Sequence, residues 1–237
     1  MNPETPLSER LMHPIARIHT DFPCKFGIPR QSGLVPSMKS RIVFEPLYRN
    51  PDALNGLEEF SHLWLIWEFS EAVRDTWSPT VRPPRLGGNI RKGVFATRSP
   101  FRPNPIGLSC VKLEEIQRNT PDGPALLVSG ADLMDQTPIY DIKPYLPFAD
   151  SHPEATGGFA DLHRDYRLEV KMEEKLKKLL PPEQIETLTE ILALDPRPAY
   201  QKDSKRIYGF PYAGMEIKFS VEEQVLTVVS IEKSVSL

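Results

Sequence analysis

The chain has 237 residues, 40% of them hydrophobic and 26% charged, and its formal net charge is −3. This length predicts one well-packed domain with a smaller second unit. The longest apolar run, residues 63–67, is too short for a membrane-spanning helix, so we expect no membrane association.

Residues 1–14 include acidic side chains and lack the basic-then-apolar order of a secretion signal, which favours a cytoplasmic location. The two cysteines, Cys24 and Cys110, are far apart and predict neither a disulfide framework nor a zinc site. The five histidines form no HxH or HExxH arrangement. We therefore expect no bound metal.

Proline and glycine interrupt the chain up to about Tyr145, and the 25 prolines of the sequence disfavour long helices there. Short segments rich in Val, Ile, Leu and aromatic residues predict strands between the interruptions. These segments are residues 15–19, 41–44, 62–69, 93–97, 109–116, 125–129 and 138–142. Short strands at this spacing predict a β-barrel or a β-sandwich.

The pattern changes after Pro153. Alternating apolar residues predict strands at 166–172, 215–221 and 225–231, and helical periodicity predicts helices at 173–180 and 183–194. Residues 151–161, with two consecutive glycines, form the best candidate linker. This part predicts a small α+β unit.

Between residues 82 and 102 the chain carries six basic residues and no acidic one. They are Arg82, Arg85, Arg91, Lys92, Arg98 and Arg102. Interleaved prolines and glycines restrict the loop, so guanidinium groups would lose less entropy on binding phosphates or carboxylates. The stretch predicts a polyanion-binding surface, although a solvated face or pairing with acids elsewhere explains the same composition.

Three further stretches carry candidate polar groups. Asn104 lies between two prolines, which restrict its backbone. Its side-chain amide is either a fixed hydrogen-bonding group for a ligand or part of a rigid structural loop. The turn after residue 129 carries Asp132 and Asp135, with Asp141 beyond, and carboxylates accept hydrogen bonds or protons. Aspartates also favour turns for local reasons. The turn at 29–35, with Ser32 and Gly33 at its centre, would let its backbone approach a ligand, or is an ordinary loop.

No Walker A, G-x-G-x-x-G or G-x-S-x-G motif is present, so P-loop, Rossmann and α/β-hydrolase chemistry lack their signatures. Six strings nevertheless carry a resemblance. They are PRQSGLV (29–35), GLEEFSHLWLI (56–66), PTVRPPRLGGN (79–89), GVFATRSPFRPNPIGLS (93–109), DQTPIYDIKPYLPFADS (135–151) and DPRPAYQ (195–201). Together they resemble the TsaA/YaeB-like (TrmO) family of S-adenosylmethionine-dependent tRNA methyltransferases.

The resemblance implies methylation of N6 of threonylcarbamoyladenosine at tRNA position 37, next to the anticodon, with S-adenosyl-L-methionine as the cofactor. It implies a mainly β fold: a small single-sheet β-barrel methyltransferase domain over residues 1–155 and a small α+β domain over residues 156–237. It also implies a homodimer.

By the same resemblance, the cofactor site draws on two turns and several single residues. They are Gln31, Ser32, Gly33, Phe69, Ser70, Arg98, Leu108, Ser129, Gly130, Ala131 and Asp132. The basic residues Arg82, Arg85, Arg91, Lys92 and Arg102 become candidates for tRNA binding.

The chemistry of this reaction asks for a proton acceptor, because the carbamoyl group withdraws the lone pair of N6. We expect Asp132 in this role, with Asp135 and Asp141 as alternatives, and Lys143 or an arginine to bind the threonine carboxylate.

Two residues depart from the family pattern. Gln136 replaces a usual glycine, which would cost about 1 kcal/mol if the turn needs positive φ, and Ser32 stands where proline is common. Two rival functions stay open: a non-catalytic RNA- or polyanion-binding barrel, and a metal-dependent hydrolase.

Overall fold

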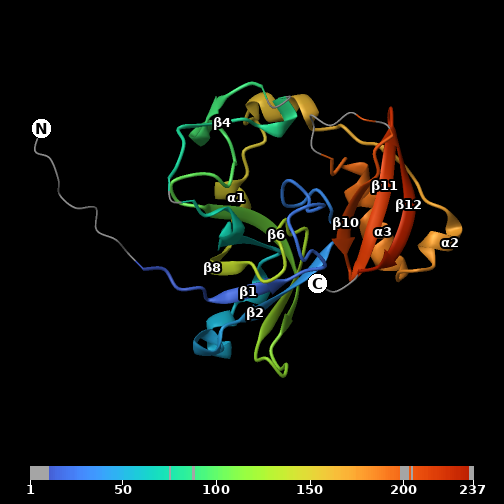
Figure 1. Cartoon of the computed structure of the whole chain (residues 1–237). Helices are drawn as coiled ribbons and strands as arrows, with labels where there is room; N and C mark the ends of the chain where they lie inside the picture. Colours follow the sequence, from blue (N-terminus) through green and yellow to red (C-terminus); the bar gives the residue numbers. More distant parts are fainter. Residues whose placement is uncertain (1–10, 75, 87–88, 198–202, 204, 235–237) are drawn as a thin grey trace, which may run out of the picture.

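The computed structural model describes residues 11–74, 76–86, 89–197, 203 and 205–234. It contains a closed six-stranded barrel and, beside it, a four-stranded sheet with helices (Figure 1). The expected mainly β fold with a barrel and a C-terminal sheet domain is confirmed. Within the described part of the chain, no helix has the length and apolar character needed to cross a membrane.

The barrel is made by β1 (Ala16–His19), β2 (Lys39–Phe44), β3 (His62–Glu68), β6 (Ile106–Gln117), β7 (Ala125–Ser129) and β8 (Pro138–Pro144). The strands are arranged in the order β1-β2-β7-β6-β3-β8, and every neighbouring pair is antiparallel. Alternate side chains fill the interior, as in β3, where Leu63, Leu65 and Trp67 are buried.

Three short 3₁₀ helices join β2 to β3: η1 (Pro46–Tyr48), η2 (Pro51–Leu54) and η3 (Leu57–Glu59). A longer segment, residues 69–105, leaves the barrel after β3 and returns at β6, and we call it the excursion. Its elements are η4 (Ser70–Ala72), β4 (Thr80–Val81), η5 (Pro84–Leu86), β5 (Lys92–Gly93) and η6 (Val94–Ala96). It forms the arch that carries the β4 label in Figure 1.

The strand expected at 93–97 is wrong. Only β5 reaches Gly93, and the following residues turn as η6. The Thr97 N–H and hydroxyl both donate to the Val94 carbonyl, at 3.1 and 2.9 Å. This local pairing closes a turn, so the β-favouring side chains of the segment never join a ladder.

The C-terminal unit begins after α1 (Pro147–Asp150) and η7 (Gly158–His163). Its sheet has the order β10-β11-β12-β9, formed by β10 (Tyr208–Tyr212), β11 (Met215–Glu222), β12 (Val225–Lys233) and β9 (Glu169–Lys171). The helices are α2 (Glu174–Lys177) and α3 (Pro182–Ala193), and α3 buries Leu188, Ile191 and Leu192.

Buried side chains join the two units into one core. The rings of Phe22 and Tyr212 lie 5.3 Å apart, and the Ser37 hydroxyl donates to Glu190 at 2.7 Å. The Ala213 N–H, at the tip of the β10–β11 hairpin, donates to the Asp21 carbonyl at 3.0 Å. The small unit is therefore held against the barrel by apolar packing and by hydrogen bonds.

Gln136 has a φ of 63°, so the turn before β8 does adopt the left-handed conformation that favours glycine. The Gln136 N–H donates to the Ile18 carbonyl at 2.8 Å, and its side-chain amide reaches His19 Nδ1 at 3.0 Å. The tie to β1 holds the turn in a conformation that the residue itself disfavours.

Candidate functional site

Two glycine turns meet at the end of β7. Gly130, with φ of 76°, receives a hydrogen bond at its carbonyl from the Gly33 N–H at 2.8 Å and donates its own N–H to Met38 at 2.9 Å. A Cβ atom on Gly130 would lie 3.3 Å from the Gly33 backbone. This close approach brings Gln31, Ser32 and Gly33 against the segment 129–132, as the resemblance implies.

β6 has an open backbone edge beside these turns. Its odd-numbered residues bond toward β3, as Leu113 does through its N–H to Ser61, whereas the Cys110 N–H points the other way and donates to Ser32 Oγ at 3.2 Å. Leu108 has the same orientation as Cys110 and lies beyond the last β6–β7 pair, Lys112 with Ser129. Within the described residues, the Leu108 N–H and carbonyl have no protein partner on this side. A donor and an acceptor in this arrangement suit the edge of a heterocyclic base.

Asp132 is held by a relay from the barrel wall. The Trp67 indole N–H donates to Ser109 Oγ at 2.9 Å, and Ser109 Oγ donates to Asp132 Oδ1 at 2.5 Å. Since the indole is only a donor, the single hydroxyl proton of Ser109 is left for the carboxylate. The relay fixes the direction of the Asp132 side chain.

Burial raises the pKa of Asp132 above its ordinary value. The Ser109 hydrogen bond, backbone N–H groups of Asp132 and Ser32, and the charge of Arg98 act in the opposite direction and lower the pKa. The net direction is upward, so Asp132 accepts a proton more readily than an exposed aspartate does.

Arg98 and Phe69 complete the group of expected cofactor residues that the fold brings together. Arg98 is exposed and donates through Nη1 to Gln31 Oε1, which ties the excursion to the first glycine turn. Phe69 packs on Trp67 with ring centroids 4.2 Å apart, and its N–H donates to the Pro105 carbonyl at 2.8 Å. Ser70 follows at the start of η4 and is exposed.

Other expected residues point elsewhere. The Ser129 hydroxyl donates to Glu114 at 2.7 Å, so only its backbone borders the turn. Asp135 accepts the Thr20 N–H at 3.0 Å at the end of β1. Lys143 of β8 lies opposite Trp64 of β3 in the strand register, and both side chains face out of the barrel. The Lys143 Nζ lies 2.8 Å from Asp141. Of the three candidate carboxylates, Asp132 alone contacts inward-facing Ser109.

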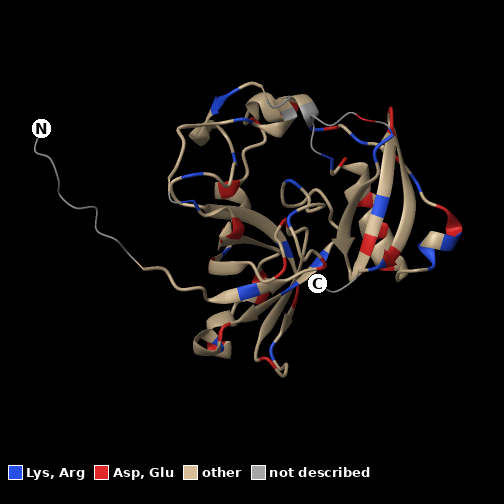
Figure 2. Ribbon diagram, viewed as in Figure 1, with Lys and Arg blue, Asp and Glu red and all other residues tan. Residues whose placement is uncertain are grey.

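The basic residues follow the excursion (Figure 2). Arg82 is exposed, and Arg91 is exposed with one hydrogen bond to Thr80 at 3.1 Å. Lys92 is half-buried, and Arg102 donates to the Thr97 carbonyl at 3.1 Å, which gives it a role in holding the loop. The side chain of Arg85 lies outside the described part of the structure.

The sequence did not lead us to Trp67, Ser109 or Gly107. A Cβ on Gly107 would lie 2.2 Å from the Trp67 ring, so the absent side chain makes room for the indole. One signal was available, because Ser109 is a polar residue at an inward position of β6, between inward Gly107 and Val111.

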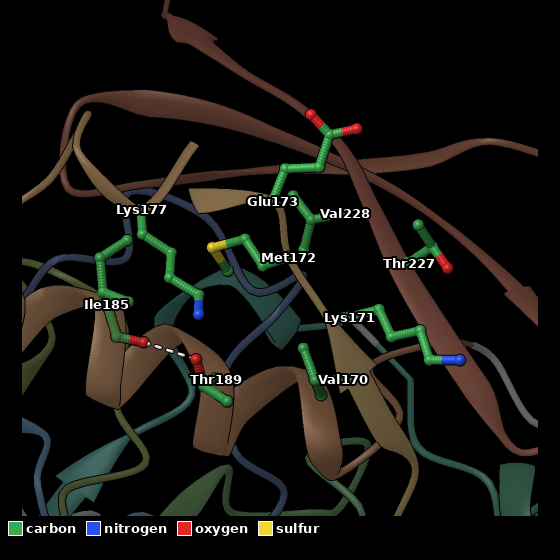
Figure 3. Close-up of a pocket in the computed structure, with 9 residues that line it drawn as sticks. All are labelled: Val170, Lys171, Met172, Glu173, Lys177, Ile185, Thr189, Thr227 and Val228. Atoms are coloured by element: carbon green, nitrogen blue, oxygen red, sulfur yellow. Dashed lines mark hydrogen bonds between the residues drawn. The ribbon is translucent and has the colours of Figure 1, made fainter. Parts of the chain in front are cut away.

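Two hollows lie outside this group of residues. One, shown in Figure 3, is lined by Val170, Met172, Ile185 and Val228 between β9, β12 and α3. The other separates residues 25–30 from Leu194 and Asp195 and borders the Gln31 turn. Among the described residues, no group of three or more His, Cys, Asp or Glu side chains is arranged to hold a metal ion.

Family models match most of the chain. The tRNA-methyltransferase O N-terminal domain matches residues 17–151, and the TrmO C-terminal domain matches residues 165–234. A crystal structure of TrmO from Pseudomonas aeruginosa superimposes with a TM-score of 0.77 at 32% identity, covering 98% of this chain and 100% of that one.

Curated relatives agree with this match. The tRNA (adenine(37)-N6)-methyltransferase of Escherichia coli (strain K12) is 41% identical over 226 residues, 92% of this chain and 96% of that one. The Eikenella corrodens protein of the same name is 45% identical over 173 residues, 73% of this chain and 97% of that one. A Pseudomonas aeruginosa relative, 42% identical over 83% of this chain and 86% of its own length, has a name that places it among S-adenosylmethionine-dependent methyltransferases. The chain therefore belongs to the tRNA-methyltransferase O family.

Proposed function

We propose that this chain is a tRNA methyltransferase that transfers a methyl group from S-adenosyl-L-methionine to N6 of threonylcarbamoyladenosine at tRNA position 37. Relatives named for methylation of adenine 37 match it over nearly their whole length. The observation that carries the proposal in this chain is the convergence of Asp132, the open Leu108 edge and the Gln31–Arg98 pair at one end of the barrel.

The chemistry of these residues fits the cofactor. S-adenosyl-L-methionine supplies an electrophilic methyl group on a positively charged sulfur and also carries an adenine ring and an amino-acid group. The open N–H and carbonyl of Leu108 suit the adenine edge, and Arg98 suits the cofactor carboxylate. The two glycine turns allow close backbone approach, and we propose that Phe69, Ser70 and the Ser129–Asp132 turn complete the cofactor site.

Asp132 is proposed to accept the proton of N6. Burial raises its proton affinity, and the relay from Trp67 through Ser109 fixes its direction. A base contributes most when its pKa approaches the working pH and its orientation is fixed in advance.

The substrate carries a threonine carboxylate, for which Lys143 or an arginine of the excursion supplies the counter-charge. Lys143 is exposed and already paired with Asp141, so recognition through Lys143 requires that pair to open. Methylation of tRNA with and without the threonylcarbamoyl group, by the parent protein and by Lys143→Ala, tests this role. A variant that keeps full selectivity removes Lys143 from recognition.

We also propose Arg82, Arg85, Arg91, Lys92 and Arg102 as tRNA-binding residues, a homodimeric assembly, and a cytoplasmic location where tRNA is available. The support for the tRNA contacts is the run of residues 82–102, which contains six basic residues and no acidic one. Light scattering after size-exclusion chromatography tests the proposed homodimer, for which we expect twice the mass of the chain.

The division into residues 1–155 and 156–237 is also a proposal. It is supported by family models that match on either side of the boundary.

Calorimetry with S-adenosyl-L-methionine tests the enzymatic proposal against a non-catalytic RNA-binding module. We expect saturable binding to the parent protein and weaker binding to Arg98→Ala. Absence of cofactor affinity, with tRNA present or absent, would favour the binding module instead.

A further inference from the structure

The excursion exposes aromatic rings that no part of the proposed reaction uses. Trp77 and Phe95 are 52% and 74% exposed, and their ring centroids lie 6.2 Å apart with the planes at 31°. Phe101, 36% exposed, lies nearby in sequence beneath the Arg74 guanidinium, 3.7 Å from its ring centroid. Single exposed apolar residues are ordinary, but a cluster on one loop marks a contact surface.

The positive charge around these rings indicates a negatively charged partner. From Thr76 to Leu113 the sequence contains no Asp or Glu, and Arg82, Arg91 and Arg98 are exposed there. Aromatic rings among arginines suit single-stranded nucleic acid, whose bases stack on the rings while its phosphates meet the guanidinium groups. Contact of this surface with the same surface of a second copy would bring like charges together.

The position of the excursion indicates which nucleotides of the RNA would contact it. Phe69 and Pro105, at its two ends, are hydrogen-bonded to each other, and Arg98 is tied to Gln31. Any base that reaches Asp132 must leave its stack, so its neighbours lose a stacking partner. The excursion starts and ends at the site where such a base would be bound.

We infer that Trp77 and Phe95 form a stacking surface for the bases that flank the methylated adenine in the anticodon loop. Phe101 and Arg74 extend this surface as a cation–π pair. The inference rests on the proposed function for the identity of the RNA, whereas the surface itself rests on ring exposure and charge.

The test uses the full chain and an anticodon stem-loop carrying threonylcarbamoyladenosine, with binding followed by fluorescence anisotropy. We expect the Trp77→Ala/Phe95→Ala double variant to bind about tenfold more weakly or worse. Its salt dependence should stay unchanged because the rings are neutral, whereas Arg82→Ala should lower the slope of log Kd against log salt by about one. Trp77→Phe should retain most of the affinity.

Leu47→Ala is the matched surface control. Leu47 is 82% exposed in η1, which follows the end of β2 farthest from the glycine turns. This variant should bind the stem-loop as the parent protein does. Thermal unfolding of each variant checks that the fold is retained.

Abasic nucleotides on either side of position 37 provide the decisive comparison. They should weaken binding to the parent protein by about the same factor as the double variant, and they should weaken binding to that variant no further. The inference would be overturned if the loss of affinity from the abasic RNA and the loss from the double variant multiplied when the two were combined. A change in Kd below about twofold in the double variant would also overturn it. A changed oligomeric state with unchanged RNA affinity would also overturn it and assign the rings to a subunit contact.

The outcome is separable from the proposed function. Binding of S-adenosyl-L-methionine without RNA should be unaffected in the double variant, since its rings lie outside the proposed cofactor site. Failure of the parent protein to bind cofactor or to methylate would contradict the proposed function and leave the stacking measurement standing.

Discussion

Burial of the Asp132 carboxylate reduces the stability of the fold where that group is ionised, a cost that its proposed role as a base would explain. Burial raises its pKa in the folded state above that in the unfolded chain, so the folded protein binds this proton more tightly. Stability from this group is therefore greatest at low pH and is lost as the pH rises through the folded-state pKa.

Asp132→Asn should separate stability from activity, because Asn keeps Oδ1 as an acceptor for Ser109 and removes the charge. We expect methyl transfer to fall on the order of 100-fold or more. We also expect a Tm at or above that of the parent protein near neutral pH, with the difference shrinking in acid. Turnover assays and thermal unfolding across pH measure both. Full turnover with normal cofactor binding would remove Asp132 from the chemistry.

Ser109→Ala removes a hydrogen bond that lowers the pKa of Asp132, so that pKa should rise further. If Asp132 must be ionised to accept the proton, the acid limb of the kcat profile should move to higher pH. Ser109→Thr, which keeps the hydroxyl, should restore the parent profile. A loss of activity without any shift of the acid limb would indicate a structural role alone.

Among the elements, β6 contacts both the packed interior of the barrel and the candidate site. Its inward face places Gly107 beneath Trp67 and Ser109 beside Asp132, while its open edge presents Leu108. Changes in packing along β6 should therefore reach the candidate base.

Gly107→Ala tests this coupling. The added Cβ would lie 2.2 Å from the Trp67 ring, so the indole must move and its bond to Ser109 with it. We expect a loss of about 1–3 kcal/mol in the free energy of unfolding, together with reduced kcat. Gly93→Ala is the control, because Gly93 has φ of −56° and open space around its added Cβ. Equal effects of the two substitutions in denaturant titrations would refute the coupling.

The barrel strands were predictable because inward and outward residues alternate with a period of two. The segment 125–129 matches β7 at both ends, and β3 and β8 differ from expectation by only a few residues. Prediction failed where local hydrogen bonds prevailed, as at Thr97, or where Gly209 and Pro211 hide the strand β10.

The candidate site was less predictable from residue patterns. Residue patterns made Asp132, Arg98 and the turn at 29–35 candidates, and the resemblance assigned them to a cofactor site. Neither gave any of them a hydrogen-bond partner. The relay through Trp67 and Ser109 depends on strand register between β3 and β6, which a single sequence does not specify.

At the scale of the whole molecule, the barrel and the small unit share one core. Phe210, 1% exposed in β10, packs edge-on to Phe26 of the barrel with ring centroids 6.1 Å apart. Gly27 has φ of +95°, and a Cβ there would lie 2.4 Å from the Phe210 ring. The two units should therefore unfold together.

Phe210→Ala should lower the free energy of unfolding by about 3–5 kcal/mol and keep a single transition. Val229→Ala, at a residue 47% exposed on β12, should change it little. Calorimetric unfolding compares the two variants. Two separate transitions in the parent protein, with only the smaller one shifted by Phe210→Ala, would contradict a shared core.

At this scale we predict that the molecule methylates N6 of threonylcarbamoyladenosine at position 37. The direct measurement is mass spectrometry of nucleosides from the anticodon loop, after incubation of the full chain with modified tRNA and isotopically labelled S-adenosyl-L-methionine. We predict one labelled methyl group on that nucleoside, and none on tRNA that lacks the threonylcarbamoyl group. Cofactor-independent RNA binding without transfer, or a label on any other nucleoside, would contradict the proposed methylation of threonylcarbamoyladenosine.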